Sequence, residues 1–240
     1  MLFRSHGVLA ANLAARGFTS SPEILEGALG FLKVFSETQD DGKILAGLGK
    51  EWMIEGNGYK PYACGVVLHP LIDAMIALSK KAKTPAGSIA RIEVQVHPDV
   101  IRITGIDQPG TGLMSKFSAN HAASVAYIDQ AAGIAQFSNE RSADASTQEL
   151  RKQITIKPVA SLRLDQAVAS VWTKSGTKFD SEIAHATGTV ANPMSDMALS
   201  EKFLGNAAPI LGESRAKALV NKIWELETLS DIGEIVRATA

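Results

Sequence analysis

The spacing of hydrophobic residues changes along the chain, with alternation of apolar and polar residues concentrated in its middle. Alternation is clearest from Ile89 to Val96, and this period of two predicts a β-strand. Two further segments, 168–173 and 178–186, flank the turn sequence at 174–177 and predict a β-hairpin. The short apolar segment at 154–156 is also expected to be a strand. The middle of the chain therefore predicts a small sheet.

Helical spacing of apolar residues dominates near both ends and recurs between the expected strands. It is strongest from Pro70 to Lys83, where proline suits the first turn of a helix. Trp52–Ile54, between glycines, is expected to form a short strand, and Gln39–Gly42 a loop. The other helices are expected from Leu9 to Gly17 and over residues 23–27, 29–35, 117–134 and 147–152, and again from Pro193 onward.

Helices at both ends with strands and helices between them predict an α+β fold, because a parallel α/β fold would alternate strand and helix throughout. The composition shifts near residue 44, where glycines become frequent around Trp52. We therefore expect a helical segment over residues 1–43 and an α+β domain that begins at residue 44.

Composition narrows the possible functions. Hydrophobic residues make up 45% of the chain and charged residues 20%, which fits a globular protein with a sizeable core. The net charge of −1 gives no excess of positive charge with which the protein would attract nucleic acid or an anionic membrane. No apolar run approaches the roughly 20 residues that span a bilayer. We expect a cytoplasmic protein without nucleic-acid or membrane partners.

Cysteine and histidine usage argues against a metal cofactor. A single cysteine, Cys64, excludes an internal disulfide and an all-cysteine metal or iron–sulfur site within one chain. The five histidines show no metal-ligand spacing, and His97 and His185 are expected to be structural. No glycine-rich nucleotide motif is present. We expect neither a metal nor another cofactor.

The segment from Tyr59 to Ala74 carries the first candidate chemistry. Pro70 places His69 at or beside the N-terminal cap of the following helix, where backbone N–H groups favour anions. Lys60 adds a cation upstream of the same turn, so a carboxylate substrate would suit this segment. The plain alternatives are a surface lysine and a capping or core histidine. Cys64 is expected to be a small buried thiol.

A second candidate lies at the start of the helix that follows Phe117. Ser118 is a good N-cap, which places His121 in the first turn. The positive end of the helix disfavours imidazolium, so His121 should be neutral and able to accept a proton. Lys116 adds positive charge nearby. The alternative is a histidine half-buried at a domain interface.

These segments resemble signatures of the MmgE/PrpD family, which includes 2-methylcitrate dehydratases and cis-aconitate decarboxylases. The resemblance rests on Lys-Pro-Tyr at 60–62, His-Pro-Leu-Ile-Asp-Ala at 69–74, Lys-Phe-Ser-Ala-Asn-His at 116–121 and Asn-Pro-Met-Ser-Asp at 192–196. It extends from about His6 to the end of the chain and covers only the C-terminal half of a member. It implies a lid-like α+β domain over residues 44–191, with residues 1–43 and 192–240 belonging to an all-helical domain.

The resemblance also implies a lyase. A polycarboxylate would lose a proton α to a carboxylate and then water, as in the 2-methylcitrate dehydratases of propionate metabolism, without metal or iron–sulfur cluster. Lys60, His69 and His121 would be catalytic, and Lys116 and Ser118 would bind substrate. Decarboxylation and epimerisation within the same family are alternatives. Some decarboxylases carry a further histidine near Gly65, and its absence here favours dehydration.

The first residues allow two interpretations. Residues 1–22 contain Arg4 and Arg16 and no acidic residue, as mitochondrial transit peptides do. The resemblance instead places a helix and a Gly-Phe-Thr turn at 7–19, and we expect a fragment or truncated product that lacks the N-terminal helical half. The partner would then be a second copy in a homodimer or the missing half. A catalytically incomplete binding module is the alternative function.

Overall fold

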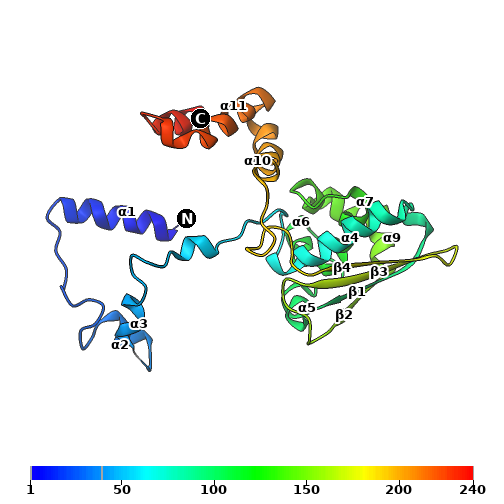
Figure 1. Cartoon of the computed structure of the whole chain (residues 1–240), viewed down its shortest axis with the longest axis horizontal. Helices are drawn as coiled ribbons and strands as arrows, with labels where there is room; N and C mark the ends of the chain where they lie inside the picture. Colours follow the sequence, from blue (N-terminus) through cyan, green and yellow to red (C-terminus); the bar gives the residue numbers. More distant parts are fainter. Residues whose placement is uncertain (1, 39, 240) are drawn as a thin grey trace. The chain divides into compact units, whose positions relative to one another are not determined.

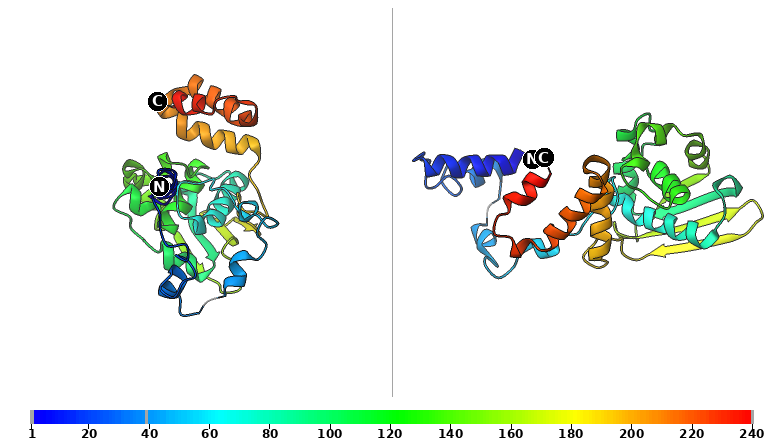
Figure 2. Two further views of the ribbon diagram at one scale, coloured as in Figure 1. Left: turned by 90° about the vertical axis from the view of Figure 1, so that its left-hand side faces the viewer. Right: turned by 90° about the horizontal axis from the view of Figure 1, so that it is seen from above.

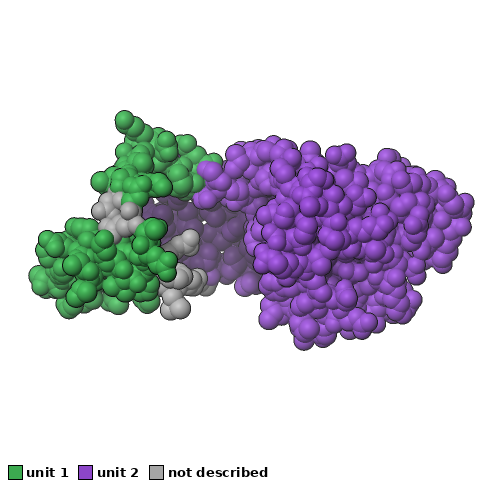
Figure 3. All heavy atoms as spheres, turned by 90° about the horizontal axis from the view of Figure 1, so that it is seen from below, with its two compact units in different colours: residues 1–55 green, residues 56–240 purple. Residues whose placement is uncertain are grey.

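The computed structural model describes residues 2–38 and 40–239, which divide into two compact units at the junction of Glu55 and Gly56 (Figure 3). The first unit contains three α-helices within its described residues: α1 (Leu2–Ala15), α2 (Phe31–Phe35) and α3 (Asp41–Leu45). Gln39, in the expected 39–42 loop, lies outside the described residues, and α3 begins inside that range.

Two expectations for the first unit are wrong. Residues 23–27 form turns in place of a helix, although the Gly27 amide donates to the Glu23 carbonyl at 2.9 Å. Glycines at 27 and 30 disfavour helix continuation. Met53–Gly56 forms the 3₁₀ helix η1 where a strand was expected, because an isolated apolar triplet has no neighbouring strand with which to pair.

The second unit contains a four-stranded sheet with the order β2-β1-β3-β4 within the described residues. The central strand β1 (Ile89–Val96) runs parallel to β2 (Ile154–Pro158) and antiparallel to β3 (Ala167–Thr173). Strand β4 (Lys178–Ile183) completes the hairpin with β3. All four expected strands of the middle region are therefore confirmed.

Helices α4 (His69–Ala82) and α7 (Ala119–Asp129) cover one face of this sheet (Figures 1 and 2). The side chains of Ile92, Val94 and Val96 point to this face and are buried. The opposite face is polar, and there Arg91 lies over the Trp172 ring at 3.7 Å. One sheet with helices on a single face is an α+β arrangement, as expected.

The remaining helices connect and extend this core. Helix α7 ends at Asp129 rather than Ile134, because Gln130 adopts a left-handed conformation with φ of 52°. Short helices α5 and α8 were not predicted, since their few residues give no hydrophobic period. The remaining helices are η2 (Val66–Leu68), η3 (Ala86–Ser88), α5 (Pro98–Thr104), α6 (Gly112–Ser115), η4 (Ala135–Phe137), α8 (Asn139–Ala143), α9 (Ala145–Arg151), α10 (Asp196–Leu211), α11 (Glu213–Trp224), η5 (Leu226–Thr228) and α12 (Gly233–Ala238).

Helices α1 and α11 carry apolar side chains that are exposed to solvent. Leu9 and Leu13 on α1 and Trp224 on α11 are exposed, although amphipathic helices normally bury such residues. Among the described helices, none has the length and apolar character needed to cross a membrane.

Two segments far apart in the sequence meet at a pair of glycines. The Tyr59 amide donates to the Gly188 carbonyl at 2.7 Å, and the Gly188 amide donates to the Asn192 carbonyl at 2.8 Å. A methyl group at Gly188 would collide with the Tyr59 carbonyl oxygen, and one at Gly58 with the Gly188 carbonyl oxygen. Gly188 also has a φ of 88°, which disfavours any side chain. Glycine therefore permits residues 56–60 and 186–190 to lie side by side.

Substitution of Gly188 tests this contact. Gly188→Ala should destabilise the protein by more than about 2 kcal/mol, because backbone strain and a steric collision add. Gly176→Ala is the matched control, since Gly176 has the same φ of 88° but nothing within 4 Å of the added methyl. The control should cost only about 1–2 kcal/mol of strain. Urea unfolding of both variants measures the difference, and equal losses would argue against the close contact.

Candidate functional site

The two adjoining segments line a cavity of about 530 Å³. Residues 56–60 with η2 and the start of α4 form part of its lining, and Leu164, Asp165 and residues 186–190 form the rest. Two of the predicted site residues, Lys60 and His69, line it together. A cavity of similar volume, about 540 Å³, lies between α10 and α11. The charged residues in its described lining, Glu213 and Lys217, pair with each other at 2.9 Å, so neither offers an unpaired charge to an anionic ligand.

His69 is the first residue of α4, directly after the capping position held by Leu68. Its side chain is only 2% exposed, and Nε2 has no hydrogen-bond partner among the described residues. Burial, with a smaller contribution from the positive charges of Lys60 and Lys202, lowers the pKa of His69 to about 4. The imidazole is therefore neutral at pH 7, and its buried Nε2 is left without a partner among the described residues.

Lys60 and Lys116 bring positive charge to the loop before α4. The Lys60 ammonium donates to the Cys64 carbonyl at 3.4 Å, while its side chain stays exposed at the cavity. Lys116 does not line the cavity, but its carbonyl accepts from the Gly65 amide at 3.2 Å. Burial raises the pKa of Cys64 to about 12 against the opposing effect of both lysines. Cys64 is thus a buried thiol and a poor nucleophile, as expected.

Asp73 was not among the predicted site residues, yet it connects the walls of the cavity. One carboxylate oxygen accepts from the Tyr62 hydroxyl at 2.5 Å, and the other accepts from the Thr187 amide at 2.7 Å. Asp73 lies four residues after His69, so both project from the same side of α4. This helical spacing is the sequence signal that could have identified Asp73.

His121 is not among the residues that line this cavity. The Ser118 hydroxyl accepts a hydrogen bond from the His121 amide at 3.2 Å, which confirms the predicted N-cap. The hydroxyl oxygen of Ser118 is therefore already engaged in capping the helix. His121 is fully buried, and its Nε2 donates to the Gln136 carbonyl at 2.8 Å. Nδ1 therefore carries no proton and has no partner among the described residues.

Burial is the main reason why the pKa of His121 lies below its usual value. The hydrogen bond to Gln136 opposes this shift, and the charges of Arg151 and Arg141 add to it. The neutral form predicted from sequence is therefore supported, with burial as its largest cause. Proton transfer by His121 and substrate binding by Lys116 and Ser118 remain predictions.

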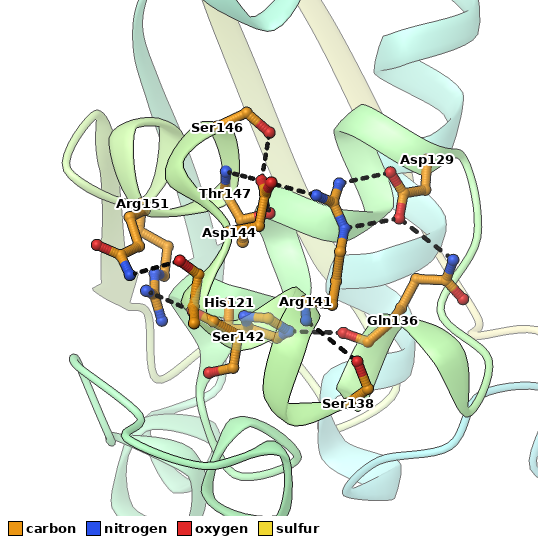
Figure 4. Close-up of polar contacts among 12 residues, drawn as sticks. His121, Asp129, Gln136, Ser138, Arg141, Ser142, Asp144, Ser146, Thr147 and Arg151 are labelled. Carbon is orange, nitrogen blue, oxygen red and sulfur yellow. Dashed lines mark hydrogen bonds and ion pairs between the residues drawn. The ribbon is translucent and has the colours of Figure 1, made fainter.

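An ion-pair network secures the loop above His121 (Figure 4). Arg141 donates to both oxygens of Asp129, at 2.6 and 3.1 Å, and to Asp144 at 2.8 Å. The Gln136 side chain donates to Asp129 at 3.2 Å. Because two parallel hydrogen bonds from a guanidinium fix its orientation, this network rigidly connects the end of α7 with η4 and α8.

The two other histidines predicted to be structural have local partners. His97 Nδ1 accepts from the Asp99 amide at 3.1 Å and caps α5. His185 Nδ1 lies 2.6 Å from the Asp165 carboxylate. Across the described ranges, no group of three or more histidine, cysteine, aspartate or glutamate side chains could hold a metal ion.

A lysine and a neutral histidine in a cavity at a helix N-terminus define a candidate site for carboxylate chemistry. The profile of the MmgE/PrpD C-terminal domain matches residues 62–226, and the chain therefore belongs to the MmgE/PrpD family. Cis-aconitate decarboxylase of Mus musculus is 24% identical over 97% of this chain and 49% of its own length. The Aspergillus terreus (strain NIH 2624 / FGSC A1156) enzyme of the same name is 23% identical over 95% of this chain and 51% of its own length. The chain spans about half the length of these relatives.

The depressed pKa of His69 predicts how stability depends on pH. Between the ordinary value of 6.5 and about 4, the unfolded chain binds a proton at this histidine that the folded chain does not. Stability should therefore fall as pH is lowered through this window, with His69 contributing about 3 kcal/mol.

Urea unfolding from pH 7 to pH 4 measures this effect in the wild type and in His69→Gln. The variant should lose less stability over the window than the wild type does. His6→Gln is the control, because His6 is exposed on α1 and should leave the slope unchanged. Identical slopes in the wild type and His69→Gln would show that His69 is not held neutral by burial.

Proposed function

We propose that the cavity binds a small polycarboxylate and that the protein is the substrate-binding half of a lyase. The observation that carries this proposal is the convergence of Lys60 with a buried, neutral His69 whose Nε2 has no partner among the described residues. The Lys60 ammonium would pair with a substrate carboxylate, and His69 would donate a hydrogen bond to the substrate or transfer a proton.

The same two groups serve a carbanion mechanism. Removal of a proton or of carbon dioxide next to a carboxylate leaves negative charge on an enediolate-like intermediate, and a nearby ammonium stabilises that charge. A histidine with a pKa of about 4 is a weak base when the cavity is empty of anions. A bound carboxylate would raise this pKa toward neutrality, so substrate binding itself would activate His69.

Two lyase reactions fit this chemistry. The similarity to proteins named cis-aconitate decarboxylase supports the loss of carbon dioxide from a cis-aconitate-like tricarboxylate as one candidate reaction. Dehydration of a 2-methylcitrate-like substrate is the second candidate, favoured by Gly65 in the loop where some decarboxylases carry a histidine. Both reactions would begin with a polycarboxylate held by Lys60. The proposal therefore specifies the class of substrate and keeps both reactions as candidates.

Binding of cis-aconitate to the purified chain tests the substrate class. Lys60→Ala should raise the Kd about tenfold or more, because one charge-assisted contact contributes about 1.5–3 kcal/mol. Lys80→Ala is the matched control, since Lys80 is exposed at the other end of α4 and should change the Kd less than twofold. Isothermal titration calorimetry gives both values. If the two substitutions changed the Kd equally, Lys60 would not be a residue of the binding site.

Turnover is expected to need more than this chain. The relatives are about twice as long, and apolar residues of α1 and α11 are exposed. We propose that helices of a second copy or of a separate helical half cover these residues and complete the site.

The purified chain should accordingly self-associate while releasing little carbon dioxide from cis-aconitate and little water from 2-methylcitrate. Light scattering during size-exclusion chromatography measures the first property, and product assays measure the second. Robust turnover that survives chelation and repurification would show that the site is complete within these residues. A compact monomer that exposes no large apolar patch would count against the proposed partner.

A further inference from the structure

The Asp73 side chain, on helix α4, forms hydrogen bonds with two separate segments beside the cavity. Its two carboxylate oxygens accept from the Tyr62 hydroxyl at 2.5 Å and from the Thr187 amide at 2.7 Å. Tyr62 lies in the loop that carries Lys60, and Thr187 lies in the facing segment that lines the cavity. Because α4 packs against α7 and against strands β3 and β4, Asp73 fixes both segments to a rigid element.

Tyr62 in turn touches the candidate catalytic group. Its ring meets the His69 imidazole edge to face, with ring centroids 5.4 Å apart and an interplanar angle of 89°. The hydroxyl end of the ring is held by Asp73, and its body packs beside His69. Burial and the Asp73 carboxylate both raise the pKa of Tyr62, so the phenol keeps its proton and donates to Asp73.

We propose that Asp73 is a positioning residue that acts through the Tyr62 ring to fix the plane of the His69 imidazole and through Thr187 to fix the opposite wall of the cavity. This inference rests on the proposed function, because it assigns a role in orienting His69 toward a polycarboxylate. Neither Asp73 nor Tyr62 lines the cavity, so both act through other residues.

The geometry distinguishes positioning from simple stabilisation. If the hydrogen bond only stabilises the fold, its removal should lower stability and leave the NMR signals and the pKa of His69 unchanged. A positioning contact would also alter the environment of the imidazole, because the Tyr62 ring loses its anchor and can turn. Misplacement of a catalytic group by about 1 Å can reduce a rate up to roughly 100-fold.

Tyr62→Phe removes only the hydroxyl that binds Asp73. Tyr127→Phe is the matched control, because Tyr127 is buried and its hydroxyl donates to the Thr84 carbonyl at 3.0 Å, in a bond unrelated to His69. Both variants should lower the urea midpoint. Only Tyr62→Phe should shift the His69 ring signals in ¹H–¹³C NMR spectra and raise the pKa of His69 toward its ordinary value, because burial is the main cause of its depression.

Asp73→Asn provides a second, independent variant. An asparagine amide has a single acceptor oxygen, so while Thr187 donates to it the Tyr62 hydroxyl loses its carboxylate acceptor and can only accept a weaker hydrogen bond from the amide nitrogen. It should change the His69 signals in the same direction as Tyr62→Phe does. In a form of the protein that turns over substrate, both variants should lower kcat about tenfold and change KM less than twofold.

The experiment separates this inference from the proposed function. If cis-aconitate fails to bind the wild type, the proposed function is wrong, while the NMR comparison still reports whether Asp73 and Tyr62 set the His69 environment. If cis-aconitate binds but Tyr62→Phe and Asp73→Asn leave the His69 signals as unchanged as Tyr127→Phe does, Asp73 only stabilises the fold and the inference is overturned.

Discussion

The close approach of Tyr59 to Gly188 is the contact on which the cavity depends, since it brings together two segments separated by most of the α+β region. A side chain at Gly58 or Gly188 would collide with the facing backbone, so the contact requires glycine at both positions. Asp73 then fastens both sides to α4 by its two carboxylate oxygens. Without this pairing Lys60 and Thr187 would belong to two separate loops.

The same enclosure explains the electrostatics of the site. At the start of α4, backbone N–H groups already favour an anion, and burial between the two segments makes imidazolium costly. Lys60 adds a positive charge to the cavity lining, whereas the carboxylate of Asp165 in the same lining is paired with Arg163 and His185. Under the proposed function, a bound anion would relieve both effects, because it would pair with Lys60 and stabilise a protonated His69. Substrate charge would then be coupled to the protonation of the candidate base.

Local features of the fold could be predicted from the sequence, whereas the site depends on contacts that sequence spacing does not reveal. The alternation at 89–96 and the helical period after Pro70 each reflect one buried face, and both elements formed as expected. The Ser118 cap is equally local. The contacts of Gly188 with Tyr59 and of Thr187 with Asp73 join residues more than a hundred positions apart, and no local pattern encodes them. The expected strand at 52–54 failed for the same reason, because a strand exists only where a partner is present.

His69 and His121 show why the start of a helix alone does not define a site. Both lie in a first helical turn, both are buried, and burial lowers the pKa of both. His121 is closed over by η4, whose Gln136 carbonyl accepts its Nε2 proton, and the Asp129–Arg141 pair holds that loop in place. His69 instead faces the cavity, with its Nε2 left without a partner among the described residues. Each ring keeps one buried nitrogen without a partner among the described residues. What distinguishes the two histidines is their tertiary surroundings, because only His69 belongs to the lining of the cavity.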